Sequence, residues 1–299
     1  MRVRCRLLAV VLLLASCADA WAADIAPQRG GVLTFGVAGE PNTYDCHATN
    51  TFAVLHYVAP HYSTLLKFDP ANYPKIIGDL AESWSSSTDG RIWTFRLRQN
   101  AQFHDGTPVT AADVKTSLDR LRDPPAGVVS VRKAQFADIV GVEAPDSHTL
   151  VVRLADFDAA FEASMASPWN CIYSAALLAR DPDYPHRRVM GSGPFEFVSY
   201  QQGQAWVGRR FERYFEPGRP YLDGFRATFV DGPATVNALS AGQIQAEFRG
   251  VTPAQRDRIR AIRGDKTRFH EGDRISVYVV ALNTEHPPLN DARVRRALT

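Results

Sequence analysis

The stretch DLAESWSSSTDGRIWTFRLRQNAQFHDGTPVTAADV, residues 79–114, decides the fold of this chain. Its first half predicts a hairpin, because Thr88-Asp89-Gly90 is a strong turn signal and the residues after it alternate between apolar and polar. Residues 103–108 then predict a tight turn, in which Asp105 bonds local backbone and Gly106 takes a positive φ. Thr110, with Asp113 three positions later, predicts a capping box at the start of a helix that the Pro124-Pro125 pair ends.

Outward from this stretch, the chain reads as a mixture of strands and helices that do not alternate strictly. Further strands are predicted at residues 31–38 and 225–230, and hairpins at residues 139–154 and 195–207. A helical pattern covers residues 51–66, interrupted by Pro60, and capped helices begin near Pro233 and at Thr252. The composition, 45% hydrophobic and 22% charged, is that of a globular protein with a sizeable core.

Three blocks of the opening stretch occur in the same order in one known family. They are DLAESW at 79–84, TFRLR at 94–98 and FHDGTPVTAADV at 103–114. With them, the chain resembles the family 5 extracellular solute-binding proteins, the peptide, nickel and oligosaccharide receptors of bacterial ABC importers. Other matching blocks extend the resemblance over nearly the whole chain: GGVLTF at 30–35, EPN at 40–42, GSGPF at 191–195, LNT at 282–284 and PPLNDARVR at 287–295.

The resemblance implies a mixed α/β fold of the bilobal, type II periplasmic-binding-protein kind with an inserted subdomain. We expect residues 24–59 and 172–265 to form the first lobe and residues 60–171 the insertion. Residues 266–299 would hold a strand at 275–282 that crosses between the lobes, and the start of the second lobe. Members continue for about 200 residues more, and the helix predicted from Asn290 has no closing signal, so we expect most of the second lobe to be missing.

The first 22 residues predict a secretory signal peptide. Three arginines precede an apolar run at 7–15 that is too short to span a bilayer, and Ala20-Trp21-Ala22 suits cleavage after Ala22. Alternatively, Leu14-Ala15-Ser16-Cys17 is a lipobox that leaves Cys17 acylated. Either way we expect a periplasmic protein. Removal of residues 1–22 changes the net charge to +2 − 3 + 1 = 0, so nothing suggests nucleic acid as a partner.

Two cysteines remain after this segment, Cys46 and Cys171, in an oxidising compartment. Because the resemblance places them on either side of the insertion, we expect them to form a disulfide. Closing so long a loop would contribute about 4 kcal/mol. Two buried free thiols remain the alternative, since the sequence does not show whether the Cα atoms approach within reach.

Catalytic and metal-binding patterns are weak in this chain. His47, His56 and His61 have spacings that do not share one helix face, and no cysteine or carboxylate pattern completes a metal site. The His104-Asp105 pair suits a turn better than a catalytic dyad. Nucleophile-elbow, zincin, P-loop and dinucleotide-binding patterns are absent from the sequence. We therefore expect no enzyme, no cofactor and no metal.

The resemblance also indicates where a solute would bind. Trp169 and Asn170 stand at the exit from the insertion near the ligand cleft, although Trp169 could equally pack on the core. Tyr44, Asp45 and His47 follow the first strand, in a loop that faces the cleft in relatives. Gly193 and Asn283 are candidates from their motifs alone.

Together these inferences imply a monomeric binding protein that captures a small solute between two lobes and delivers it to an inner-membrane ABC permease. A peptide is the favoured solute, because strand edges can bind any peptide backbone. A metal chelate, a sugar and an opine stay open. A periplasmic sensor or chaperone with the same fold, and a secreted hydrolase, are the alternative functions. With half of the clamp missing, we expect this chain alone to bind its solute weakly or not at all.

Overall fold

The computed structural model describes residues 27–271 and 281–298, and it divides the chain into two compact units. The first unit ends at Val251 and the second begins at Thr252. The expected signal peptide and most of the expected crossing strand at 275–282 lie outside the described residues. The unit boundary falls before residue 265, where we expected the first lobe to end, and the division into lobes stays a prediction.

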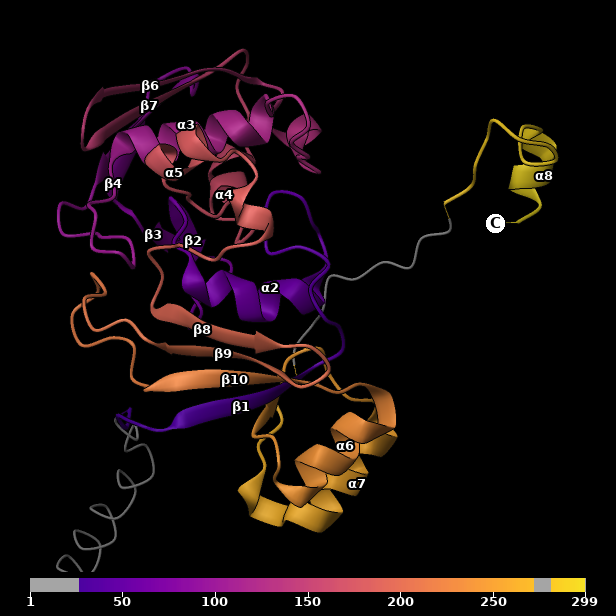
Figure 1. Cartoon of the computed structure of the whole chain (residues 1–299). Coiled ribbons are helices and arrows are strands. Elements are labelled where there is room, and N and C mark those ends of the chain that lie inside the picture. The colour runs from indigo at the N-terminus through magenta and orange to yellow at the C-terminus, as the bar shows by residue number, and fades with distance from the viewer. Residues whose placement is uncertain (1–26, 272–280, 299) are drawn as a thin grey trace, which may run out of the picture. The chain divides into compact units, whose positions relative to one another are not determined.

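A five-stranded mixed sheet forms the base of the first unit (Figure 1). Strand β1 (Val32–Val37) pairs in parallel with β10 (Gly224–Phe229) on one side and β11 (Ala246–Glu247) on the other. The hairpin of β8 (Phe195–Gln201) and β9 (Ala205–Arg210) extends the sheet antiparallel to β10, as predicted. Trp206 on β9 is fully buried and is the largest core side chain of this layer.

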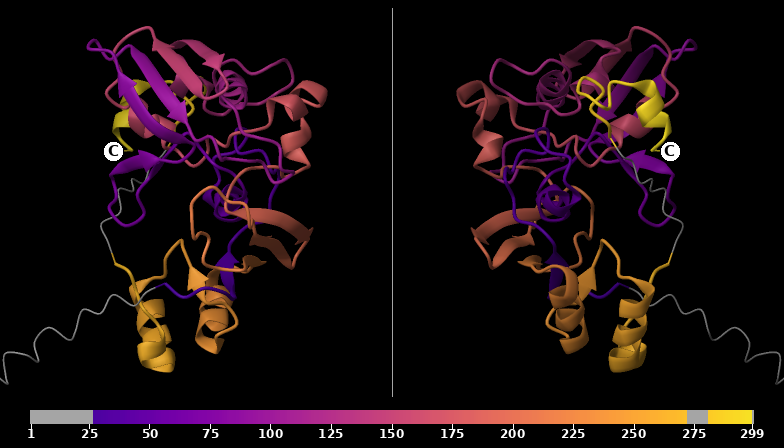
Figure 2. Two further views of the ribbon diagram at one scale, coloured as in Figure 1. Left: turned by 90° about the vertical axis from the view of Figure 1, so that its left-hand side faces the viewer. Right: turned by 90° about the vertical axis from the view of Figure 1, so that its right-hand side faces the viewer.

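Helices cover both faces of this sheet (Figures 1 and 2). On one face lies α2 (Phe52–Val58), whose Tyr57 ring packs 5.1 Å from the Trp206 ring. On the other face lies α6 (Gly232–Ala241), which closes at Gly242 in the left-handed conformation. The helix predicted over 51–66 is wrong in its second half. It ends at Val58, because Pro60 starts a 3₁₀ turn, and Leu66–Phe68 is strand β2.

Residues 81–154, which lie within the expected insertion, build a second, antiparallel sheet above α2 (Figure 1). Its strand order is β4 (Ala81–Ser86), β5 (Ile92–Leu97), β7 (Thr149–Leu154) and β6 (Ile139–Asp146). Helix α3 (Ala111–Arg122) packs on β6 and β7 and buries Val114, Leu118 and Leu121 as predicted. The short elements β3 (Ile76–Gly78), α4 (Phe161–Met165) and α5 (Ala175–Arg180) complete the layer, with β3 pairing β2.

The stretch that opened the analysis folds as predicted. The Ser87 carbonyl accepts a hydrogen bond from Gly90 N at 2.8 Å, closing the hairpin turn between β4 and β5. Phe95 is fully buried while Arg96 is exposed. At the helix start, Thr110 N donates to the Asp113 carboxylate at 2.8 Å, which is half of the predicted capping box.

The second unit contains α7 (Pro253–Arg263) and α8 (Ala292–Arg296). Thr252 and Gln255 form the predicted capping box of α7, with Thr252 N donating to Gln255 Oε1 at 2.8 Å. Helix α8 is capped by Asp291 and not by the predicted Asn290, because the Asp291 carboxylate accepts from Arg293 N at 2.8 Å. Among the described residues, the helices all fall short of the length and apolar character needed to cross a membrane.

Candidate functional site

The carboxyl ends of the parallel strands bring three loops to one edge of the five-stranded sheet. These loops follow β1, β10 and β11 and comprise residues 38–51, 230–231 and 248–251; we call them the strand-end loops. In open α/β sheets, ligands bind outside the carboxyl ends of the strands. The strand-end loops and the start of α2 are therefore the candidate ligand site of the first unit.

Tyr44 in the first strand-end loop is a half-buried aromatic side chain. Its ring stands edge-on to Trp206 at 4.9 Å and to Tyr200 at 6.2 Å. Glu40 in the same loop accepts hydrogen bonds from the Tyr200 hydroxyl and from Gly203 N. These bonds lower the pKa of the Glu40 carboxyl. The loop is thereby fastened to the β8–β9 hairpin.

Asp45 is fully buried, so its side chain supports the loop from inside. Its carboxylate accepts from Arg120 Nη2 at 2.6 Å and from the Tyr173 hydroxyl at 2.9 Å. Burial by itself raises the pKa of this carboxyl, but the neighbouring His47 and Arg120 outweigh burial and lower it below its ordinary value. The ion pair joins the first strand-end loop to α3 of the insertion.

His47 is also fully buried, with both ring nitrogens bonded inside the protein. Arg120 Nη1 lies 3.1 Å from Nδ1, and Nε2 lies 3.0 Å from the Cys171 carbonyl oxygen. These partners assign the proton to Nε2, since the guanidinium can only donate. Burial lowers the pKa of His47 to about 3, so the ring is neutral at neutral pH.

Cys46 and Cys171 form the predicted disulfide in the structure. Their Cα atoms lie 6.1 Å apart, and the bridge closes a loop across 125 positions of sequence. It ties the first strand-end loop to the segment that leaves the insertion. Asn170 beside it is buried and donates from Nδ2 to the Ser164 carbonyl at 2.7 Å.

Trp169 lies next to this bridge and pairs with Phe52, which sequence reasoning missed. Phe52 is the first residue of α2, and its ring meets the Trp169 ring edge-on at 6.1 Å. Trp169 is 9% exposed, whereas Phe52 is 57% exposed, so Phe52 presents most of the pair to solvent. The sequence signal that could have indicated Phe52 is a large apolar residue directly after the helix cap at Thr51. We call Phe52 and Trp169 the aromatic pair.

A second exposed aromatic residue lies on the strand-end loop after β11. Phe248 is 51% exposed, and its ring lies 5.7 Å from the His56 ring of α2. His56 Nδ1 is buried and has no hydrogen-bond partner among the described residues. Burial, and then the charge of Arg249, lowers the pKa of His56. The edge of the sheet thus offers aromatic rings and one neutral imidazole.

The remaining predicted contacts are Gly193 in the first unit and Asn283 in the second. Gly193 is buried against backbone, donates from N to the His61 carbonyl at 3.0 Å, and accepts from His104 Nε2 at 3.0 Å. Asn283 belongs to the second unit, where its exposed side chain accepts from Glu285 N at 3.0 Å. Their roles as ligand contacts stay predictions.

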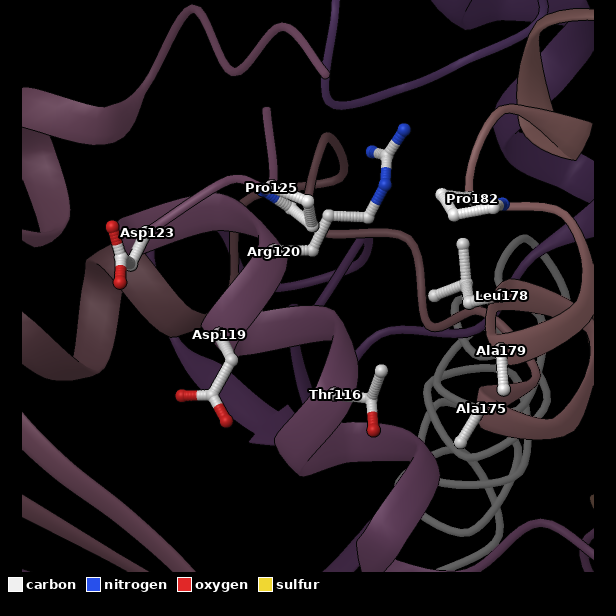
Figure 3. A pocket seen from close by; sticks show the side chains of 9 residues that line it. All are labelled: Thr116, Asp119, Arg120, Asp123, Pro125, Ala175, Leu178, Ala179 and Pro182. Atoms are coloured by element: carbon white, nitrogen blue, oxygen red, sulfur yellow. The ribbon is translucent and has the colours of Figure 1, made fainter. Parts of the chain in front are cut away.

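A separate cavity of about 440 Å³ opens between α3 and α5, away from the strand-end loops in sequence (Figure 3). Its walls are mostly apolar, and the Arg120 side chain runs along one of them. Sequence reasoning did not predict it. The lining residues are Thr116, Asp119, Arg120, Asp123, Pro125, Ala175, Leu178, Ala179 and Pro182.

Comparison with known proteins agrees with this architecture. The middle part of the bacterial extracellular solute-binding proteins of family 5 matches residues 75–299. The probable D,D-dipeptide-binding periplasmic protein DdpA of Escherichia coli is 30% identical over 90% of this chain and 52% of its own length. The di/tripeptide-binding protein 2 of Pseudomonas aeruginosa is 32% identical over 100% of this chain and 58% of its own length.

Two solved structures show the same architecture. The binding protein MoaA of A. tumefaciens R10, in complex with mannopinic acid, is 30% identical with a TM-score of 0.76, over 91% of this chain and 55% of that protein. The oligopeptide-binding protein AppA of Bacillus subtilis, in complex with a nonapeptide, is 25% identical with a TM-score of 0.70, over 79% of this chain and 47% of that protein. The chain thus spans about half the length of the relatives that it matches.

Proposed function

Because the chain belongs to the bacterial extracellular solute-binding proteins of family 5, we propose that it captures a small solute, above all a peptide, for an ABC importer. The members of this family bind solutes and do not catalyse reactions. We place the protein in the periplasm, after removal of residues 1–22 or with Cys17 acylated. Its further partner would be an inner-membrane permease, which recognises the loaded state.

One observation carries the proposal: exposed and half-buried aromatic residues stand at the carboxyl ends of the parallel strands. Tyr44, Phe52 and Phe248 lie there on three different segments, and apolar rings with few polar groups suit a site that binds varied side chains. A peptide is preferred over an opine because the relatives from Escherichia coli and Pseudomonas aeruginosa are both named for short peptides. Mannopinic acid in MoaA makes an opine the competing solute.

The same proposal assigns the parts of the chain. Residues 24–59 and 172–265 serve as the first jaw, with residues 60–171 inserted into it, and residues 266–299 lead toward a second jaw. Tyr44 and the aromatic pair would contact the solute. Asp45, His47 and Asn170, whose side chains are buried, would hold these contacts in place from behind.

Ligand-observed NMR tests the proposal, because saturation transfer detects complexes with dissociation constants up to the millimolar range. We expect signals from trialanine and from a nonapeptide, and none from glucose. Phe52→Ala should remove the signals by deleting the most exposed ring of the site. Phe157→Ala is the matched control, since Phe157 is 65% exposed but lies on the insertion. If only mannopinic acid gives a saturation-transfer signal, the proposal that the solute is a peptide is refuted. If no probe gives a signal, the proposal that this chain captures a solute is refuted.

A further inference from the structure

Arg132 is a half-buried arginine of the insertion that no motif singled out and that stands directly behind the aromatic pair. We infer that Arg132 is a positioning residue of the ligand site, which holds the Trp169 ring against Phe52. The inference deepens the proposed function, since it concerns the face that would meet the solute. The contacts themselves do not depend on that function.

The Arg132 guanidinium joins two segments that come from opposite ends of the insertion. Nη1 donates to the Thr49 carbonyl at 3.0 Å, and Nη2 donates to the Cys46 carbonyl. The arginine therefore binds the first strand-end loop on both sides of His47. Nη2 also donates to the Trp169 carbonyl at 3.4 Å. Arg132 therefore bridges the same two segments as the Cys46–Cys171 disulfide.

The same guanidinium also fixes the orientation of the ring. Its central carbon lies 5.4 Å from the centre of the Trp169 ring, within the range of a cation–π contact. Phe52 meets that ring edge-on at 6.1 Å. The backbone and the ring of Trp169 are thus both held by one side chain, which leaves the indole little freedom to turn away from Phe52.

The arrangement calls for an arginine in particular. Among the described residues, no carboxylate lies within 4.0 Å of Arg132, so the side chain is not present to form an ion pair. The planar guanidinium of arginine can donate to several carbonyl oxygens and stack on a ring at the same time, whereas the ammonium group of lysine is a compact point charge. Burial lowers the pKa of Arg132 to about 10, which leaves it charged at neutral pH.

Fluorine NMR of protein labelled with 5-fluorotryptophan tests this role without any ligand. The labelled protein starts after Ala22 and so lacks Trp21. Trp169→Phe assigns the Trp169 resonance, and Trp84, Trp93 and Trp206 serve as internal references in the same spectrum. In Arg132→Met we expect the Trp169 resonance to shift and broaden while the three references stay in place. Arg91→Met is the control, because Arg91 makes only a surface ion pair with Asp156.

A Trp169 resonance that stays unchanged in Arg132→Met would overturn the inference. If that variant fails to fold, Arg132→Lys is used instead, because lysine keeps the positive charge but lacks the planar guanidinium. A shift of Trp169 alone in Arg132→Lys supports positioning, whereas equal shifts of all four tryptophans mean that Arg132 only stabilises the fold, which refutes it.

Titration of trialanine into the same labelled samples separates the inference from the proposed function. We expect trialanine to move the Trp169 resonance of the wild-type protein, and its dissociation constant to be about tenfold weaker in Arg132→Met. If trialanine moves no resonance in the wild type, the peptide proposal fails, but the ligand-free spectra still decide the role of Arg132.

Discussion

Buried histidines illustrate how single residues set the behaviour of this protein. His61 is fully buried, with Nδ1 at 2.7 Å from the Phe195 carbonyl oxygen and Nε2 accepting from Trp206 Nε1 at 2.8 Å. Both nitrogens are satisfied only when the ring is neutral, with its proton on Nδ1. Burial lowers the pKa of His61 to about 3, as it does for His47. Two of the three histidines that were considered for a metal site, His47 and His61, are therefore built into the core.

These two histidines predict that the protein loses stability in mild acid. Their folded-state pKa lies below the unfolded value of 6.5, so their contribution is complete above pH 6.5 and falls as the pH drops toward 3. Over the first 1.5 or so pH units, each histidine should cost about 2 kcal/mol of unfolding free energy. Urea unfolding at pH 7 and pH 5 measures this loss. His61→Gln should reduce the difference between the two pH values, while His286→Gln, at an exposed position, should leave it unchanged.

Gly193 has a structural role that predicts the effect of adding one methyl group. A Cβ atom there would lie 2.6 Å from both the His61 carbonyl carbon and the Tyr62 nitrogen, which are backbone atoms. We expect Gly193→Ala to lower the unfolding free energy by about 3 kcal/mol or more. Gly141→Ala, whose Cβ would meet nothing nearer than 3.9 Å, should change it by less than about 1 kcal/mol. Equal effects in thermal unfolding would show that the close backbone approach is not what requires glycine.

At the scale of elements, Asp113 couples two helices through one carboxylate. Oδ2 accepts from Thr110 N at 2.8 Å and from the Thr110 hydroxyl at 2.7 Å, which begins α3. Oδ1 accepts from Ala175 N at 2.8 Å, which fixes the start of α5. The capping residue predicted for α3 therefore also positions the start of α5, 62 residues later in the chain.

This coupling predicts a large effect for a single capping residue. Asp113→Ala leaves two backbone N–H groups without a partner, and we expect a loss of about 2–4 kcal/mol in urea unfolding. Asp119→Ala on the same helix breaks only the partly exposed pairs with Lys115 and Arg122, and should cost less than about 1 kcal/mol. A similar loss in both variants would contradict the proposed bridge to α5.

Sequence reasoning succeeded for elements whose signals are local. The hairpins and the capping boxes of α3 and α7 depend on turn residues and on polar groups three positions apart, and these appear in the structure as predicted. The predicted helix over 51–66 was wrong in its second half, because the helical pattern there competes with Pro60. Strand β11 was not predicted, because it has only two residues. Sequence reasoning also missed contacts between distant residues. Asp45 pairs with Arg120, 75 positions away, so the side chain of this predicted ligand contact is buried.

On the scale of the whole molecule, the largest single constraint is the Cys46–Cys171 disulfide. It closes a loop across 125 positions, for which the loss of unfolded-state entropy corresponds to about 4–5 kcal/mol. We expect the double variant Cys46→Ala with Cys171→Ala to be less stable by this order in urea unfolding. Because both cysteines are buried, alanine leaves no unsatisfied polar atom. A loss below about 1 kcal/mol would mean that the unfolded chain is already compact enough to make the bridge redundant.

The family and the architecture were predictable because motif blocks are spread along the chain, whereas the site was only partly so. The motifs pointed to the loop after β1, but they could not say which of its side chains face outward. Tyr44 is half-buried, while Asp45 and His47 point inward. Phe52 and Arg132 lie outside every motif, and their placement follows from how the insertion returns to the first strand-end loop.

The position of the disulfide also has a consequence for biogenesis. On the proposed export route, the chain enters the oxidising compartment amino end first, so Cys46 arrives well before Cys171. The Cys46 thiol therefore stays unpaired until the entire insertion has been translocated. Oxidation of this pair would therefore act as a late checkpoint that closes only after residues 47–170 are across.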